Sequence, residues 1–415
     1  MNSSIALPGR VEDARLRKRY AAERRFRFAG LFAVGLSAAF LAFLLFNMAW
    51  KGLGGFTHFE AALPIDFPRS DLILDPVALK GPEGQQIVAS ADLEGVLSQA
   101  AIQAYGPEAA EAFGGAGARK LGRELLAEPD IVGRRVTLWL PVSSKIDVAA
   151  KQDSDAASEK LVSALQSKDS LRRTFNWDFL VESDATDSSA VGVWGALKGS
   201  FLTIIMTMFL AFPIGVLAAV YLEEFASRNR WTDAIEVSIN NLAAVPSIIF
   251  GLLGLAVFLN FMHLPRSAPL VGGLTLALMT MPVIVIAGRN AIKSVPPSIR
   301  DAALGIGASK MQVVFHHVLP LALPGILTGT IIGMARALGE TAPLLMIGMR
   351  AFIAAPPSGM TDPATVLPVQ IFLWSDEVDR GFVEKTSAAI IVLLLFMLMM
   401  NGLAIYLRNR FERRW

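Results

Sequence analysis

The chain has 415 residues, of which 53% are hydrophobic and only 18% are charged, and its mean hydropathy is +0.49. Soluble globular proteins carry about a quarter charged residues, so this composition excludes an ordinary soluble enzyme. The chain contains no cysteine, which excludes disulfides and thiolate metal sites.

Long uncharged runs indicate membrane spans. About 20 apolar residues in a helix cross a hydrocarbon core of about 30 Å. Five runs of this length carry no Lys, Arg, Asp or Glu, and a sixth is interrupted only by Arg336 and Glu340. The sequence therefore predicts an all-α polytopic membrane protein with six transmembrane helices, at about 28–50, 199–222, 237–261, 267–288, 319–348 and 386–407.

The positions of Lys and Arg predict the orientation of these spans. Residues 1–27 form a basic segment with eight Lys and Arg, and four more Arg lie in the last eight residues. Because basic residues favour the cytosolic side, both termini and the loop 289–318 are expected in the cytosol. This rule also explains the basic N-terminus without a nucleic-acid partner.

A polar segment of residues 51–190 separates the first two spans and is long enough for a core of its own. Strand patterns occur at Asp71–Leu74 and Arg135–Leu140, and helical spacing occurs at Leu93–Tyr105, Ala118–Ala127 and Ala157–Gln166. We expect a small periplasmic α+β domain inserted between helices 1 and 2, followed by a membrane domain of residues 191–415. No catalytic constellation stands out in the insert.

Arg336 and Glu340 are the strongest candidates for a functional site. A charged residue at mid-membrane costs about 2.5–3.5 kcal/mol on insertion scales and usually marks a transport path or an internal ion pair. Their i, i+4 spacing places them about 6 Å apart on one helix face, and the guanidinium fork suits phosphate oxygens. An ion pair that only fixes helix packing is the alternative.

The polar segment Asp301-Ala302-Ala303-Leu304-Gly305-Ile306-Gly307 lies between two apolar runs and is followed by Leu319-Pro320. Its small residues would let another backbone approach closely. The spacing resembles the Glu-Ala-Ala loop of ABC-importer permeases, with Asp301 in place of Glu and His317 in place of Ile. That resemblance implies a coupling helix that docks on an ATPase, through Asp301, Ala302, Ala303, Gly307, Leu319 and Pro320. An ordinary cytosolic connector is the alternative.

From Thr174 onward the chain resembles the PstA-type permeases of bacterial phosphate ABC importers. The resemblance rests on Phe175–Leu180, Pro213–Leu222, Glu224, the Asp301 loop and Arg336–Leu345. It implies a type I ABC-importer permease core in the bacterial inner membrane, with Arg336, Glu340 and Thr341 on the substrate path. The implied partners are a homologous second permease in a heterodimer, two ATP-binding ATPase subunits and a periplasmic phosphate-binding protein.

No Gly-x-x-x-x-Gly-Lys-Ser/Thr loop occurs in the sequence, so ATP hydrolysis is expected from a separate subunit. We expect no cofactor, and a metal site at the adjacent His316 and His317 is disfavoured because neighbouring helical residues diverge and no third ligand is evident. Two alternatives stay open. The cargo could be another oxyanion or a phosphonate, or the chain could be a membrane-anchored sensor or scaffold with a ligand-recognising outer domain.

Overall fold

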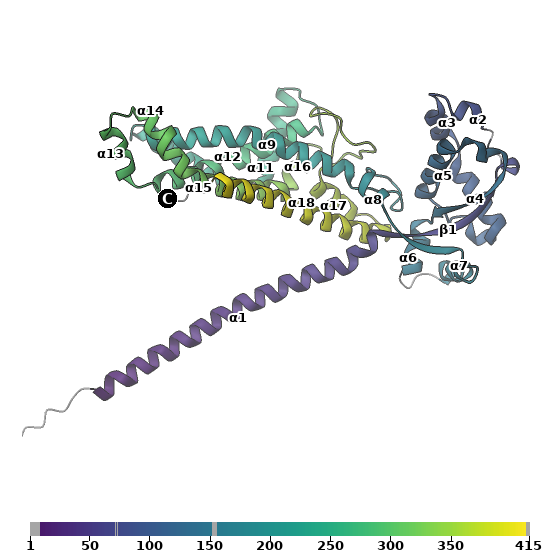
Figure 1. Ribbon diagram of the computed structural model, residues 1–415, viewed down its shortest axis with the longest axis horizontal. Coiled ribbons are helices and arrows are strands. Elements are labelled where there is room, and N and C mark those ends of the chain that lie inside the picture. Colours follow the sequence, from purple (N-terminus) through teal and green to yellow (C-terminus); the bar gives the residue numbers. More distant parts are fainter. Residues whose placement is uncertain (1–8, 71, 73, 152–155, 412–415) are drawn as a thin grey trace, which may run out of the picture. The chain divides into compact units, whose positions relative to one another are not determined.

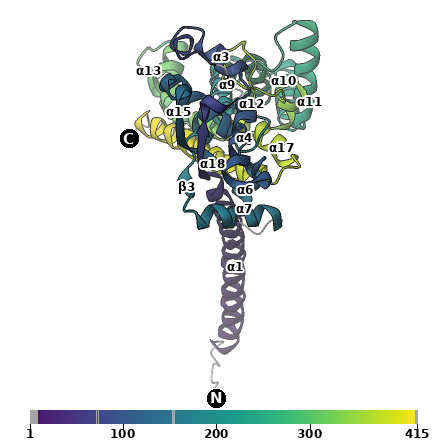
Figure 2. The same cartoon turned by 90° about the vertical axis from the view of Figure 1, so that its right-hand side faces the viewer.

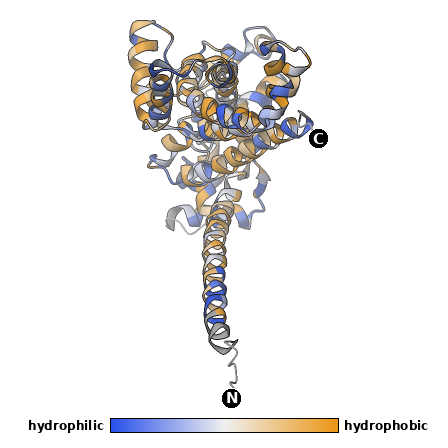
Figure 3. Cartoon of the chain, turned by 90° about the vertical axis from the view of Figure 1, so that its left-hand side faces the viewer, coloured by the Kyte–Doolittle hydropathy of each residue, from blue (hydrophilic) through white to orange (hydrophobic). Residues whose placement is uncertain are grey.

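The computed structural model describes residues 9–70, 72, 74–151 and 156–411. By its contacts the chain divides into two units, Met1–Lys51 and Gly52–Trp415. The described part of the first unit is helical throughout and belongs to α1 (Gly9–Gly55). Along this helix the residues change from hydrophilic near the N-terminus to mainly hydrophobic (Figure 3), and Leu16–Gly55 qualifies as a membrane span.

The insert is built on a three-stranded antiparallel sheet in the order β2-β1-β3, with β1 at Thr57–Asp66, β2 at Arg135–Pro141 and β3 at Leu171–Phe175. Six α-helices accompany the sheet in the part of the insert that the structure describes (Figure 1): α2 (Pro76–Leu79), α3 (Gly84–Ser90), α4 (Leu93–Tyr105), α5 (Gly115–Ala127), α6 (Ser144–Lys151) and α7 (Ala156–Ser167). The core forms where the apolar side of β1 meets these helices, and it includes fully buried Leu63, Leu97, Leu121 and Leu140.

Sequence patterns identified the insert's long helices better than its strands. The helix Leu93–Tyr105 and the strand beginning at Arg135 are confirmed, and the helix expected at Ala118–Ala127 begins earlier, at Gly115. The expected strand Asp71–Leu74 falls partly outside the described residues, and Leu72 and Leu74 lie in irregular structure. Strand β1 was not predicted because Ala61-Ala62 and Pro64 are poor strand formers.

The membrane part comprises eleven α-helices within the described residues (Figures 1 and 2): α8 (Asp178–Val181), α9 (Trp194–Val220), α10 (Arg230–Ala243), α11 (Ser247–Gly254), α12 (Pro269–Lys293), α13 (Pro297–Gly305), α14 (Lys310–Gln312), α15 (Leu319–Gly339), α16 (Ala342–Met346), α17 (Leu367–Ser375) and α18 (Gly381–Phe411). Three π-helical turns occur at Tyr221–Phe225, Leu255–Phe261 and Val313–Val318.

Five helices of the described chain are long and apolar enough to cross a membrane, or six if a bent pair counts as one span. The bent pair differs from the single helix expected for the third span at 237–261. Arg230–Ala243 and Ser247–Phe261 meet at 101°. Pro246 stands at the N-cap of α11, and the residue before a proline is disfavoured in the helical region, so the helix breaks there.

The fifth predicted span, 319–348, also differs from the structure. Helix α15 ends at Gly339, Glu340 adopts an extended backbone, and α16 begins at Ala342. Hydropathy alone could not locate this break because apolar residues continue beyond it. The other predicted spans lie within or close to longer helices; α12, for example, runs on to Lys293, so the first five residues of the expected loop 289–318 are helical.

Helix α12 lies at the centre of the bundle, between α9 and α15. Small residues permit this close packing. A Cβ atom on Gly273 would stand 2.5 Å from Met206 of α9, and one on Gly329 of α15 would overlap the side chain of Ala287 of α12. These contacts fix α15, which carries one candidate site at each of its ends.

Candidate functional site

The first candidate site is the pair Arg336–Glu340 at the C-terminal end of α15. Arg336 Nε lies 3.4 Å from Glu340 Oε1, and the two side chains are 45% and 18% exposed. Ala337 and Leu338 are buried in the bundle core, together with Leu344. Because these neighbours hold the packed face of α15, Arg336 projects from the face that the single chain leaves uncovered.

The break after Gly339 changes how the pair is held. The sequence predicted both residues on one continuous helix, but Glu340 lies beyond the helix end with φ −77° and ψ 126°. Thr341 follows as the N-cap residue of α16 and is half-buried. Glu340 therefore reaches Arg336 from the C-cap position, where its own N–H still donates to Ala337 O at 3.3 Å.

Two hydroxyl side chains of α9 form hydrogen bonds in the buried interior of the membrane part. Ser200 Oγ accepts a hydrogen bond from the backbone N–H of Leu367 at 2.8 Å, at the start of α17. Thr207 donates to the carbonyl oxygen of Thr203 at 2.8 Å. Ser200 thus joins two helices, which is the interhelical role that polar residues commonly have in membranes.

The second candidate site is the short helix α13 between α12 and α15. Pro297 occupies its first turn, and its C-terminal end is closed by Gly307 at φ +88°. The N–H of Gly307 donates to Leu304 O at 2.9 Å, and the N–H of Ala308 donates to Ala303 O at 3.1 Å. This is a Schellman arrangement, which favours glycine at the left-handed position.

Buried and charged contacts anchor α13 to the membrane helices. Ala303 is buried beside Val295, Val314 and Val318. Arg300 donates to Glu224 Oε1 at 2.8 Å and also to the carbonyl oxygens of Val295 and Ile292. The sequence singled out Glu224 without its partner, since 76 residues separate the two.

An apolar hollow of about 860 Å³ lies between α13 and the start of α15. Asp301, Ala302 and Ile306 are exposed at α13, and Ile306 is 84% exposed. The π-helical turn Val313–Val318 carries exposed His316 and His317 at the edge of this hollow. The residues lining it are Ser294, Val295, Pro296, Ile299, Ala302, Ala303, Ile306, His316, His317, Pro320 and Leu321.

The structure thus brings the predicted residues together in two groups. Arg336, Glu340 and Thr341 adjoin the C-terminal end of α15, while Ala302, Ala303 and Pro320 line the hollow at its N-terminal end. Asp301 and Gly307 lie on the same short segment, and Leu319 is the first residue of α15. A helix of this length spans about 30 Å, so the groups are separated by the thickness of a hydrocarbon core.

Sequence reasoning did not identify a third feature, the junction between the insert and α18. The Lys151 ammonium group, with a side chain only 7% exposed, donates to Glu384 Oε2 at 2.9 Å and to Asp147 Oδ2 at 2.6 Å. It also donates to the carbonyl oxygens of Gly54 and Thr57. One buried cation therefore ties α6, β1 and α18 together.

A second buried charge lies on the sheet of the insert. Glu60 on β1 accepts hydrogen bonds from Lys120 at 2.5 Å and from Arg172 at 2.6 Å, and His58 Nε2 lies 3.6 Å from its Oε1. Burial alone would raise the pKa of Glu60, but His58, Lys120 and Arg172 outweigh burial and lower the pKa from 4.5 to about 2. The carboxylate is therefore ionised at any physiological pH.

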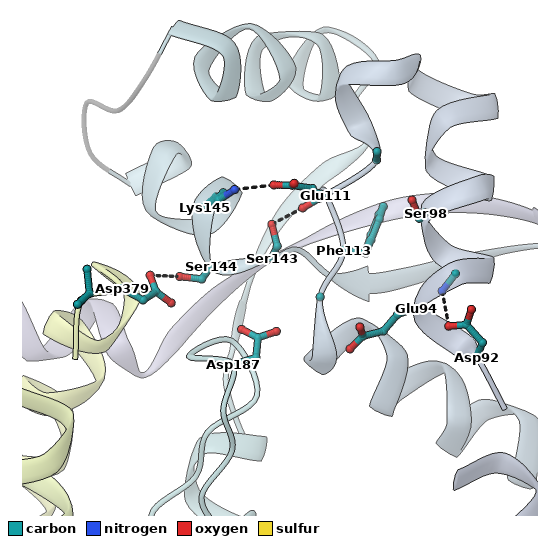
Figure 4. A pocket seen from close by; sticks show the side chains of 14 residues that line it. Asp92, Glu94, Ser98, Glu111, Phe113, Ser143, Ser144, Lys145, Asp187 and Asp379 are labelled. Carbon is teal, nitrogen blue, oxygen red and sulfur yellow. Dashed lines mark hydrogen bonds and ion pairs between the residues drawn. The ribbon is translucent and has the colours of Figure 1, made fainter. Parts of the chain in front are cut away.

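Residues of the insert and the N-terminal approach to α18 also border a hollow of about 820 Å³, shown in Figure 4. Asp92, Glu94, Glu111, Asp187 and Asp379 contribute carboxylates to its wall. Several are already engaged: Lys145 pairs with Glu111, and Ser144 donates to Asp379. Among the described residues no three His, Cys, Asp or Glu side chains are placed to hold a metal ion, so this hollow has no metal site within that part of the chain.

Two family models match the chain. A domain of unknown function, DUF3333, matches residues 13–160, and the binding-protein-dependent transport system inner membrane component matches residues 196–414. The second match covers more than half of the chain.

Relatives agree with these matches. The chain is 36% identical over 165 residues to the probable ABC transporter permease protein YqgI of Bacillus subtilis, covering 39% of this chain and 55% of that protein. It is 33% identical over 171 residues to the phosphate transport system permease protein PstA 1 of Mycobacterium tuberculosis, covering 41% and 56%. The chain thus spans about half the length of these two relatives. It is also 31% identical over 214 residues to PstA of Yersinia pestis, covering 51% and 71%.

Among solved structures, the chain is similar to a chain of the MetNI methionine ABC transporter in inward-facing conformations, with 19% identity and a TM-score of 0.43, covering 53% of this chain and 98% of that one. The resemblance to PstA-type permeases is confirmed by the curated relatives, and the multi-pass helical architecture accords with it. The chain belongs to the family of binding-protein-dependent transport system inner membrane components.

Proposed function

We propose that this chain is a permease subunit of an ATP-driven importer that carries inorganic phosphate across the bacterial inner membrane. The observation that carries the proposal is the Arg336–Glu340 pair, a half-exposed cation at the end of α15 restrained by one carboxylate. The phosphate permeases among its relatives support the choice of cargo.

In this proposal Arg336 binds the incoming anion through its planar fork, and Glu340 holds the guanidinium in place when no anion is bound. The 3.4 Å separation between Nε and Oε1 is longer than a strong charge-assisted hydrogen bond, which measures about 2.7–2.9 Å. A phosphate oxygen can therefore compete for the guanidinium, and Glu340 keeps the residence time of the anion short by repelling it. Thr341 offers a hydroxyl beside the same path.

The energy for import enters at the other end of α15. We place α13 as the coupling helix, with Asp301, Ala302 and Gly307 against an ATPase subunit and Ala303, Leu319 and Pro320 supporting it from the membrane side. Two ATPase subunits, a homologous second permease and a periplasmic phosphate-binding protein complete the importer. The termini and α13 lie in the cytoplasm, the insert lies outside, and α10 and α11 together form one broken span of six.

Uptake of radiolabelled phosphate by cells that depend on this importer tests the proposal. Arg336→Gln is expected to lower uptake about 10- to 100-fold, since a hydrogen bond to a charged group is worth about 1.5–3 kcal/mol. Arg336→Lys keeps the positive charge but lacks the planar fork, so its phosphate uptake is expected to lie between those of the wild type and Arg336→Gln. Arg266→Gln, an exposed arginine in the loop before α12, serves as the matched control.

Each variant is compared at equal amounts of assembled importer in the membrane. Normal uptake by Arg336→Gln at equal assembly would remove Arg336 from the mechanism. Competition by unlabelled arsenate, sulfate and a phosphonate on the wild-type importer then tests whether phosphate is the preferred oxyanion.

A further inference from the structure

The segment that leads from the insert into the membrane part exposes three large apolar side chains close together in sequence. Phe175 is 44% exposed, Trp177 is 67% exposed and Val181 is 58% exposed. The rings of Phe175 and Trp177 touch edge to face, with centroids 4.7 Å apart. A soluble surface rarely presents such a patch unless something covers it.

The backbone that carries these side chains is firmly held. Phe179 is fully buried against Phe56 and Trp374, with ring centroids 5.6 and 6.4 Å away. Asp178 accepts a two-pronged hydrogen bond from Arg123 of α5, at 2.9 and 2.5 Å. Exposure of Phe175, Trp177 and Val181 is therefore a property of the fold and not of a frayed end.

The strand register gives the level of this patch relative to the membrane. Phe175 is the Cα partner of Thr57, and the N–H of Asn176 donates to Phe56 O at 2.8 Å. Phe56 and Thr57 follow the first uncharged run, which ends at Trp50, by only six and seven residues. On the other side, the N–H of Trp194, the first residue of α9, donates to Glu182 O at 2.9 Å. The patch thus adjoins the segment that follows the first predicted span and the first residue of α9.

A cation accompanies the patch on the same face of β3. Arg173 and Phe175 are two residues apart, so their side chains point to one side of the sheet. Arg173 is exposed, and its guanidinium donates to Thr57 Oγ1 at 3.0 and 2.9 Å. Neither contact neutralises its charge. Arg172, on the opposite face, is already paired with Glu60.

We propose that Phe175, Trp177, Val181 and Arg173 form an interfacial seat that binds the phospholipid headgroup region of the outer leaflet and rests the insert on the membrane. Aromatic rings concentrate at this depth in membrane proteins, and an arginine beside them pairs with lipid phosphate. The seat rests on the orientation proposed above, with the insert outside the cell membrane, and not on the identity of the cargo.

The absence of native cysteine makes a direct test possible. Trp177→Cys and Val181→Cys are each labelled with a nitroxide in the full chain, assembled with its partner subunits in nanodiscs of phosphatidylethanolamine and phosphatidylglycerol. Val77→Cys, at a 77% exposed position of α2, is the matched aqueous control. Power-saturation electron paramagnetic resonance then compares collisions with oxygen, which enriches in lipid, and with a water-soluble nickel chelate.

The nitroxides at 177 and 181 are expected to collide several-fold more often with oxygen than with the nickel chelate. The nitroxide at 77 is expected to collide more often with the nickel chelate. Equal nickel access at 177 and 77 would overturn the proposal. Protection of 177 from both reagents would also overturn it, because that pattern indicates a protein partner as the occupant.

A second measurement covers the case in which a cysteine variant does not assemble. Nanodiscs containing lipids brominated near the headgroup end of their chains quench nearby tryptophan fluorescence. The conservative variant Trp177→Phe is expected to lose a measurable share of the quenchable signal, and an unchanged quenchable signal would contradict the seat.

Discussion

Lys151 of α6 and Glu384 of α18 are joined by a 2.9 Å hydrogen bond across 233 residues of sequence. Both side chains are nearly buried, at 7% and 11% exposure. A buried ion pair persists only when the remaining hydrogen-bonding capacity is met, and Lys151 meets it with Asp147 and the carbonyl oxygens of Gly54 and Thr57. The insert is therefore attached to the last membrane helix by a specific polar contact.

Lys151→Met is expected to destabilise the protein by about 3–5 kcal/mol, because it leaves the carboxylates of Asp147 and Glu384 buried without their shared cation. The check is the thermal unfolding midpoint of the purified full chain in detergent. Lys145→Met is the control, since Lys145 is a 70% exposed lysine of the same helix, and exposed substitutions usually change stability by less than about 0.5 kcal/mol. Equal unfolding midpoints for Lys151→Met and Lys145→Met would contradict the stabilising role of the Lys151 contacts between the insert and α18.

Gly55→Ala is expected to destabilise the contact between the end of α1 and α18. The added Cβ would stand 2.7 Å from the carbonyl oxygen of Glu384 and 2.8 Å from the Cβ of Ala388, and overpacking of this kind costs about 1–3 kcal/mol. Gly402→Ala on α18 meets nothing within 4 Å and is expected to stabilise its helix by up to about 1 kcal/mol. The two variants should shift the unfolding midpoint in opposite directions.

Gly307→Val is expected to weaken association with the ATPase subunit. Its φ of +88° costs an L-residue about 1–2 kcal/mol, and a β-branched side chain is poorly tolerated there. The measurement is the amount of ATPase that co-purifies with the tagged chain. Gly305→Ala, two residues earlier, lies in the helical region with nothing within 4 Å and should leave co-purification intact; equal loss in both would point to the surface of α13 and not to its turn.

Acid is expected to weaken the insert through Glu60. The folded-state pKa of about 2 lies below the ordinary 4.5, so this carboxylate stabilises the fold above pH 4.5, and the contribution is lost as the pH falls from 4.5 towards 2. A shift of this size corresponds to about 3 kcal/mol. The wild type should therefore unfold at a higher temperature than Glu60→Gln at pH 6, and this difference in midpoint should shrink towards pH 3. Glu111→Gln, at a 77% exposed carboxylate, should show only a small gap throughout.

The sequence predicted the membrane class and singled out the candidate residues that flank α15, because uncharged runs and the Arg336 and Asp301 motifs are local patterns. It placed Arg336 and Glu340 close together, and the structure confirms that proximity at 3.4 Å. It could not predict the break at Gly339 or the 101° bend near Pro246, since hydropathy averages apolar residues regardless of backbone direction.

Contacts between distant segments were also beyond the sequence. The partners of Lys151 and Arg300 lie 233 and 76 residues away, and no periodic pattern connects them. Strand β3 was missed because it is five residues long and carries Arg172 and Arg173. Its identity depends on pairing with β1, which only the folded chain reveals.

The pairing of Thr57 with Phe175 has a consequence for how this protein could be rebuilt. Directly opposed residues of antiparallel strands have Cα atoms about 4.5–5.5 Å apart, a gap that one or two residues can bridge. The chain leaves for the insert and returns from it at almost the same point. The whole domain is therefore a cassette whose entry and exit meet at these two residues, and a replacement domain would need equally close ends.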